Sequence, residues 1–133
     1  LVEVPGASAR RLHLTESLQG ELARKADAIP VDPEAPLLAD GAGNPLDEAA
    51  IDEQLAFAAH DAAIRHPEEV TGRALHFTYA AFLARQGIRM SDLSAKVGRL
   101  SGAIGAELMR LAPPGKVRSA DDVDLVYPSF RFG

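Results

Sequence analysis

The sequence predicts an α+β domain dominated by helix. We expect a short N-terminal β-hairpin over residues 1–14, about five helices within residues 15–112, and a tail over residues 113–133. Alanine, the best helix former, occurs 24 times among the 133 residues, and the aromatic residues number only seven. β-Branched residues are sparse beyond the first few positions, which disfavours a large sheet. At this length we expect a single domain, residues 1–133.

The first 14 residues are typical of two short extended segments around a turn. Valine alternates with a polar residue at positions 2–4, Pro5-Gly6 interrupts the run, and leucine alternates again at positions 12–14. The alternation on both sides of the turn predicts a short β-hairpin.

Two helices are predicted in the next part of the chain. Thr15 caps the first, which runs for roughly 12–15 residues and ends at Pro30. Asp47 caps the second, and His66-Pro67 stops it. One stripe of the second helix is expected to be apolar, namely Ile51, Leu55, Ala58 and Ala62.

Three further helices follow. Thr71 caps a helix over residues 72–86, which Gly87 ends. Ser91 begins a short helix to about Val97, and Ser101 begins a fifth helix that Pro113 ends. Four residues of the 72–86 helix are expected to share its inner face: Leu75, Thr78, Tyr79 and Phe82.

Charge is distributed unevenly along the chain, which carries a net −5. Residues 27–64 contain nine acids and no lysine or arginine, whereas residues 65–118 contain nine bases and four acids. A phosphate-binding surface is therefore expected only within residues 65–118. The chain as a whole would not be drawn to nucleic acid.

Composition excludes several classes of protein and site. No apolar run approaches the ~18 residues that a membrane helix needs, so we expect no membrane partner. The first residues carry no signal peptide, and the absence of cysteine excludes disulfides and thiolate sites. We therefore expect a cytoplasmic protein. Because the chain does not begin with Met, we expect it to be a piece of a longer one.

A specific order of features begins at Thr71. The stretch reads T-G-R-A-L-H-F-T-Y-A-A-F-L-A-R-Q-G and is followed by I-R-M-S-D-L-S-A-K-V-G-R-L-S. It resembles the C-terminal half of the catalytic domain of tyrosine recombinases, the phage integrase family. There, a helix carrying His-x-x-Arg-His-Thr and a closing Gly precedes a short helix and a Gly-His-Ser step. The upstream hairpin, helix, G-x-P-L turn and second helix match this order too, so the resemblance covers almost the whole chain.

The resemblance implies a set of catalytic residues that this sequence replaces. In the family, arginines and histidines hold the scissile phosphate and a tyrosine attacks it. The motif histidines and arginine fall here on Arg73, His76, Phe77 and Arg99, and the nucleophile falls near Leu108. The hairpin turn has Pro5-Gly6-Ala7-Ser8 where the family has a lysine. Since His76 lacks the fork of a guanidinium and leucine cannot attack phosphorus, we expect no strand cleavage and name no catalytic residue.

Three of these positions remain candidates for contact with DNA phosphate: Arg73, His76 and Arg99. The two arginines are equally consistent with solvated surface residues, and His76 with a partly buried structural histidine. Tyr127 is a late tyrosine in a Val-Tyr-Pro segment, which favours packing of the tail over a role as a displaced nucleophile.

Other candidate groups are weaker. His60 and His66 are six residues apart on the predicted second helix and share no face, so we expect no metal site and no cofactor. A group of four acids is expected to be a solvated face: Asp47, Glu48, Asp52 and Glu53. Residues 91–108 also resemble a helix-turn-helix, but the second helix offers only Arg110 for reading bases.

The resemblance thus implies a recombinase-like domain, without cleaving activity, that is associated with recombination or integration of mobile DNA. It would act by binding duplex DNA or by assembling with active recombinase subunits. Self-association through the tail, residues 116–133, is a further implication of the family. The alternative is an acidic protein-interaction module that binds no DNA, indicated by the 27–64 stretch.

Overall fold

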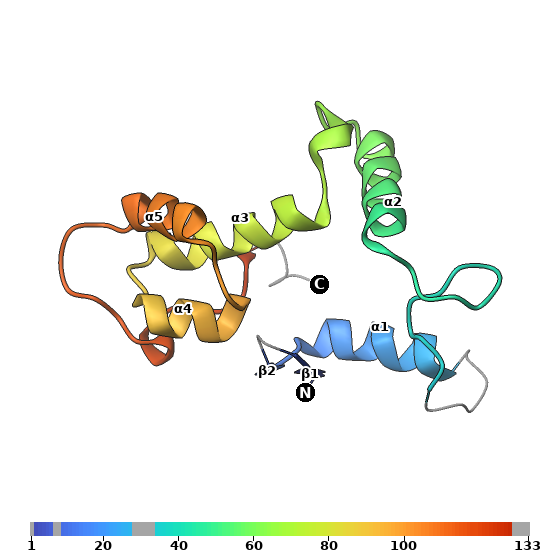
Figure 1. The fold of residues 1–133 in the computed structure, drawn as a ribbon, viewed down its shortest axis with the longest axis horizontal. Coiled ribbons are helices and arrows are strands. Elements are labelled where there is room, and N and C mark those ends of the chain that lie inside the picture. Colours follow the sequence, from blue (N-terminus) through green and yellow to red (C-terminus); the bar gives the residue numbers. More distant parts are fainter. Residues whose placement is uncertain (1, 7–8, 28–33, 129–133) are drawn as a thin grey trace. The chain divides into compact units, whose positions relative to one another are not determined.

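The computed structural model describes residues 2–6, 9–27 and 34–128 (Figure 1). The expected small, mostly helical α+β chain with a two-stranded N-terminal hairpin and five helices is confirmed. Among the described residues, no helix is both long and apolar enough to cross a membrane. The elements are β1 (Val2–Val4), β2 (Arg10–Leu12), α1 (Glu16–Asp27), α2 (Glu48–Asp61), the 3-10 turn η1 (Pro67–Glu69), α3 (Gly72–Arg85), α4 (Met90–Val97), α5 (Gly102–Leu111) and the 3-10 turn η2 (Ala120–Asp122).

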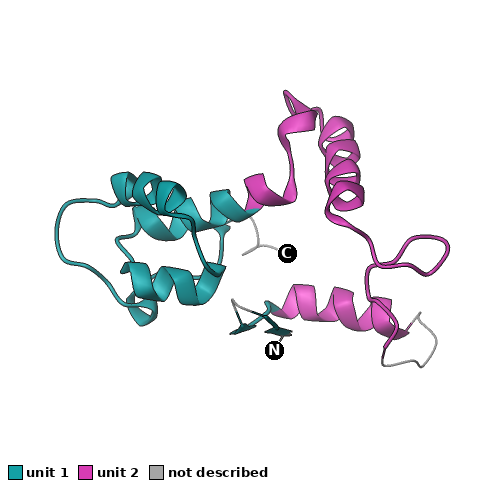
Figure 2. Cartoon of the chain, viewed as in Figure 1, with its two compact units in different colours: residues 1–15, 76–133 teal, residues 16–75 magenta. Residues whose placement is uncertain are grey.

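The chain divides into two compact units, coloured separately in Figure 2. Unit 1 comprises residues 1–15 and 76–133, and so contains the hairpin, α4, α5 and most of α3. Unit 2 comprises residues 16–75, with α1, α2 and η1. α3 therefore begins in unit 2 and continues in unit 1.

The hairpin is short and antiparallel, with Glu3 opposite Arg11 and Val4 opposite Arg10. Gly6 takes a φ of +97°, a left-handed conformation that glycine adopts without strain, and this closes the turn. Successive side chains of a strand point to opposite faces. Arg10 and Leu12 are accordingly half-buried, whereas Arg11 is exposed and pairs with Glu3 at 3.1 Å. The hairpin contacts α4 through β2.

The core of unit 1 is built from α3, the turn after it, α4 and α5. Its largest wholly buried side chains are Leu83, Leu93 and Leu108, one from each helix. Burial of a leucine contributes about 1.5–3 kcal/mol. Five further buried side chains complete the cluster: Ala80, Ala81, Ala84, Ile88 and Val97.

The predicted inner face of α3 was wrong in detail. Leu75 is 50% exposed and Thr78 is exposed, while Tyr79 and Phe82 are only half-buried. The buried side of this helix carries Leu83 and three alanines instead, namely Ala80, Ala81 and Ala84. The same correction applies to α2, where Ala59 is buried and the predicted Ala58 and Ala62 are exposed.

The segment after α5 returns to the end of α3. The N–H of Arg118 donates to the carbonyl of Gly87 (2.8 Å), and the N–H of Arg89 donates to the carbonyl of Arg118 (2.9 Å). These bonds form an isolated parallel bridge between Ile88 and Arg118. The predicted tail thus begins with a strand-like contact to its own unit.

Unit 2 is held by the start of α3 against α2. The N–H of Gly72 donates to Oδ1 of Asp52 (2.8 Å), and Nε of Arg73 donates to Oε1 of Glu48 (2.7 Å). α1 has no buried residue. The predicted stop at Pro30 falls outside the described residues.

Three of the predicted helix caps are confirmed. The side chains of Asp47, Thr71 and Ser101 accept hydrogen bonds from N–H groups three residues ahead. Ser91 is not the first residue of its helix, because α4 begins at Met90 with Arg89 at the cap position. The extended backbone of Arg89, fixed by its bond to residue 118, starts the helix one residue earlier.

Candidate functional site

Arg99 lies in an open groove of unit 1. The groove has a volume of ≈ 400 Å³ and is formed by the hairpin, α4 and the segment that follows α4. Its lining contains two arginines and two serines, and none of the described residues that line it is acidic. The full lining is Ala9, Arg10, Ser91, Ser94, Ala95, Gly98, Arg99 and Leu100.

Gly98 sets the position of Arg10 in this groove. It follows α4 as the C-cap residue, with a φ of +88°. A Cβ on residue 98 would lie 2.8 Å from Nη1 and 3.2 Å from Cζ of Arg10, closer than atoms in contact allow. The missing side chain therefore leaves the space that the guanidinium of Arg10 fills.

His76 holds the chain next to the groove. It stands on α3, and its Nε2 lies 2.6 Å from the carbonyl oxygen of Val97, so the N–H at this position donates to the end of α4. Val97 is two residues before Arg99. Since helix ends leave carbonyl groups without an intrahelical partner, His76 satisfies one of them and fixes the chain just before the groove. It is a positioning residue here.

Arg73 belongs to unit 2, not to the groove. Its side chain is 85% exposed, and its guanidinium is paired with Glu48. Of the three predicted phosphate contacts, the structure therefore brings His76 and Arg99 into one region of unit 1 and leaves Arg73 in the other unit. Arg10 is the functional candidate that the sequence analysis missed. The alternation of Arg10, Arg11 and Leu12 in β2 was the available signal, because it places Arg10 on the half-buried face.

The position that the resemblance to recombinases assigns to the nucleophile lies in the hydrophobic core. Leu108 is wholly buried between α5 and its neighbours, so no side chain at this place reaches solvent without rearranging the unit. Phe77, at a position where the resemblance to recombinases places a histidine, is 36% exposed. A Tyr side chain introduced at position 108 would bury its hydroxyl, which costs free energy unless it finds a partner.

Both tyrosines pack the tail onto α3. The hydroxyl of Tyr79 donates to the carbonyl of Leu125 (2.7 Å), and burial raises the pKa of this phenol. The ring of Tyr127 meets that of Phe82 edge-on, with centroids 5.2 Å apart. The expectation that Tyr127 packs against the body of the domain agrees with this contact.

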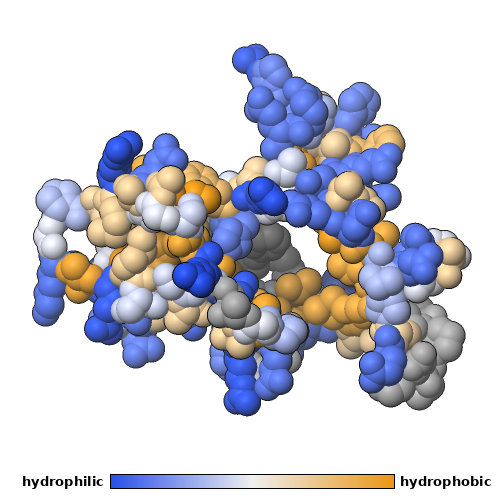
Figure 3. Space-filling model, viewed as in Figure 1, coloured by the Kyte–Doolittle hydropathy of each residue, from blue (hydrophilic) through white to orange (hydrophobic). Residues whose placement is uncertain are grey.

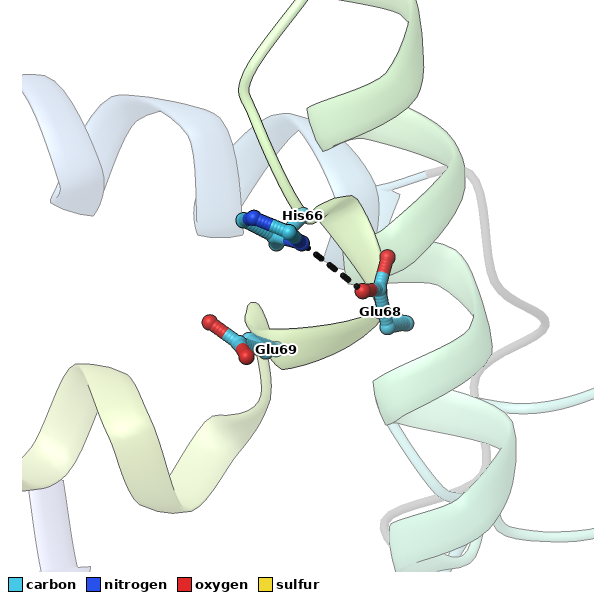
Figure 4. A group of neighbouring side chains, drawn as sticks. All are labelled: His66, Glu68 and Glu69. Carbon is cyan, nitrogen blue, oxygen red and sulfur yellow. Dashed lines mark ion pairs between the residues drawn. The ribbon is translucent and has the colours of Figure 1, made fainter.

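The described part of unit 2 contains one group of possible metal ligands, shown in Figure 4: His66, Glu68 and Glu69. Nδ1 of His66 lies 3.4 Å from a carboxylate oxygen of Glu68. All three side chains are exposed, in a part of unit 2 that is hydrophilic in Figure 3. Exposed groups of this kind are common without an ion, so we assign no metal site to these residues.

The predicted location of His66 was wrong. α2 ends at Asp61, and His66 follows outside the helix with a left-handed φ of 57°. His60 remains on α2 and is exposed beside Asp61. The acids predicted to form a solvated face partly serve the fold, since Asp47 caps α2 and Asp52 and Glu48 hold the start of α3.

Comparison with known protein families, with curated proteins and with solved structures found no match for this chain.

Proposed function

We propose that this chain is a recombinase-like domain that binds the backbone of duplex DNA without cleaving it. The observation that carries the proposal is the groove of unit 1, in which Arg10 of the hairpin and Arg99 after α4 line one surface with no acidic neighbour in the lining. Arginine combines a positive charge with a planar set of N–H donors that matches the oxygens of a phosphate group. Backbone contacts of this kind supply affinity for DNA without reading its sequence.

The distribution of charge between the units supports the same function. Unit 1 has ten lysines and arginines against six acids, a balance of +4, whereas unit 2 has four against thirteen, a balance of −9. Together they give the net −5 of the chain. The groove therefore lies in the unit whose field attracts a polyanion.

The lack of cleavage follows from the residues at the family's catalytic positions. Leu108 stands in the core where a nucleophile would be needed, and His76 uses its Nε2 on the carbonyl of Val97. Tyr79 and Tyr127 hold the tail. These side chains stabilise the fold, so we assign no catalytic step to them.

The second candidate function is an acidic protein-interaction module that binds no DNA. The observation that favours it is α2, where Phe57 is 61% exposed on a helix that contains no lysine or arginine. Association through the tail would first require its release, because residues 118–127 already bond to α3 and the turn after it within the same chain.

Binding of a fluorescent duplex, followed by anisotropy at about 50 mM salt, tests the proposal. We expect salt-sensitive binding that Arg99→Ala weakens and that Arg110→Ala, an exposed arginine of α5 outside the groove lining, leaves nearly unchanged. No binding at this salt concentration would contradict the proposal and favour the interaction module. A denaturing gel on the same samples should show no covalent DNA adduct; an adduct that disappears in Tyr127→Phe would overturn the non-cleaving assignment.

A further inference from the structure

We infer that the groove of unit 1 seats one phosphodiester group, held by Arg10 and Arg99 together with the hydroxyls of Ser91 and Ser94. This inference rests on the proposed function and specifies the site within it. Of these four residues, only Arg99 stands at a position that the resemblance to recombinases assigns. The ligand it names is the sugar-phosphate backbone of duplex DNA, and Gly98 is the residue that makes the site possible.

The two arginines come from segments far apart in the sequence. Arg10 lies on β2 and Arg99 follows α4, and both line the same groove. Each guanidinium has five N–H donors in a fixed fork, a geometry that matches the oxygens of a phosphate. Charge-assisted bonds to phosphate oxygens are about twice as strong as neutral ones. Two such groups on one surface, with no carboxylate in the lining, select an anion.

The two serines add hydroxyl donors on the α4 side. Ser91 and Ser94 are three residues apart and therefore lie on the same face of the helix. Serine hydroxyls are common partners of phosphate oxygens in DNA complexes. Their place beside the arginines distinguishes this groove from a surface that is merely basic.

The remaining lining and the volume fit a phosphodiester with its sugars. Ala9, Ala95 and Leu100 give the groove an apolar part that suits deoxyribose carbons. The ≈ 400 Å³ falls within the range of roughly 300–1,000 Å³ that is usual for ligand sites and exceeds the space of a phosphate alone. The groove is open, so a continuous backbone can enter and leave it.

Gly98 leaves the space that the Arg10 side chain occupies in this arrangement. With any other residue, Cβ would meet Nη1 of Arg10 at 2.8 Å, and the left-handed φ of +88° would be strained. Gly98→Ala should displace the Arg10 guanidinium from the groove while both charges remain in the protein. The glycine is thus a positioning residue for the phosphate contact.

Variants of the hairpin arginines provide a matched test. Arg10 and Arg11 are neighbours on β2, but Arg10 faces α4 and lines the groove, whereas Arg11 is exposed and paired with Glu3. We expect Arg10→Ala to weaken duplex binding about tenfold, since a charged hydrogen bond is lost. Arg11→Ala removes the same charge and should weaken binding less than about twofold by its effect on the general field. Equal losses in both variants would overturn the inference.

Two further variants separate charge from geometry. Arg10→Lys keeps the charge and loses the planar fork of donors. The double variant Ser91→Ala/Ser94→Ala keeps all charges. Both variants should weaken binding of the duplex without changing how binding depends on salt concentration. Gly98→Ala should resemble Arg10→Ala. If Gly98→Ala does not fold, as judged from the amide spectrum, Arg10→Lys decides alone, and wild-type affinity in that variant would contradict the inference.

Inorganic phosphate distinguishes the failure of this site from the failure of DNA binding. In a titration followed by amide chemical shifts, phosphate but not chloride should move the signals of Ser91, Ser94, Gly98 and Arg99. Duplex binding with no response at these amides, or with Arg10→Ala at wild-type affinity, refutes the site and leaves the proposed function. Phosphate binding at these amides without duplex binding refutes the proposed function and retains an anion site.

Discussion

The amide of Gln86 attaches the C-terminal segment to α3 by two hydrogen bonds. Its Nε2 donates to the carbonyl of Asp124 (2.9 Å), and its Oε1 accepts the N–H of the same residue (2.8 Å). One side chain thereby satisfies both polar backbone groups of Asp124, as a neighbouring strand would. The flanking residues Val123 and Leu125 then pack against the core.

Gln86→Ala should destabilise unit 1 by about 1–3 kcal/mol, because two partly buried backbone groups lose their partners. The measurement is the urea midpoint of unfolding, with Gln54→Ala as the control. Gln54 is exposed on α2, and its replacement should change stability by less than about 0.5 kcal/mol. Equal midpoints for the two variants would show that the amide does not hold the tail.

Asp92 joins the same segment to the start of α4. Its carboxylate accepts the N–H of Ala120 and Nε of Arg89, both at 2.9 Å. The hydrogen bond from Ala120, followed by that from Arg89, holds the pKa of Asp92 below its ordinary value of 3.8. A carboxyl group whose pKa is lowered by folding stabilises the fold above its unfolded pKa, and this contribution is lost as the pH falls through the folded pKa.

We therefore expect the attachment at Ala120 to persist at pH 3.8 and to weaken below it. The amide signal of Ala120, followed by NMR between about pH 6 and pH 2, should titrate with the carboxyl carbon of Asp92. Asp92→Asn should abolish the transition at Ala120. A midpoint above 3.8 would contradict the assigned hydrogen bonds.

Among the helices, the end of α2 shows most clearly what the sequence could not predict. The N–H of Ile64 donates to the carbonyl of Ala59 (2.9 Å), and the N–H of Ala63 donates to that of His60 (3.0 Å). This is a Schellman motif, in which the residue after the cap is left-handed. That residue is usually glycine, but here it is Ala63 with a φ of 55°. Alanine favours helix, so the sequence indicated a longer one.

Ala63→Gly should stabilise the protein by about 0.5–1 kcal/mol, because the left-handed backbone at this position strains any residue with a Cβ. Ala62→Gly is the matched control. Ala62 is the adjacent residue with a φ of −82°, so glycine there brings only added freedom to the unfolded chain and should destabilise. Thermal unfolding of both variants measures the difference. Stabilisation by neither would contradict the helix end described for α2.

The elements that the sequence predicted well are those with local signals. Asp47, Thr71 and Ser101 cap their helices because a side-chain oxygen near free N–H groups needs no tertiary partner. Which faces of α2 and α3 are buried depends on the neighbouring element that covers them. Hydrophobicity alone therefore predicted Leu75, rather than the alanines, on the buried face of α3. The groove required the contact of β2 with α4, which no local pattern contains. Hence Arg99 was predicted and Arg10 was missed.

At the scale of the whole molecule, charge and packing follow the division into units. Unit 1 carries a balance of +4, a core of leucines from three helices, and the groove. Unit 2 carries a charge balance of −9. Within its described part, Ala59 is the one hydrophobic residue that is buried. The negative net charge of the chain is thus the sum of a basic unit and a strongly acidic one. The proposed contact with DNA lies in the basic unit.

The salt dependence of duplex binding tests this account most directly. Each phosphate that a protein neutralises contributes about 0.9 to the slope of log K against log salt concentration. We predict that the double variant Arg10→Ala/Arg99→Ala lowers the magnitude of this slope by about one, because the two arginines hold a single phosphate, and that Arg11→Ala leaves it nearly unchanged. A double variant that binds with the wild-type slope would contradict the account.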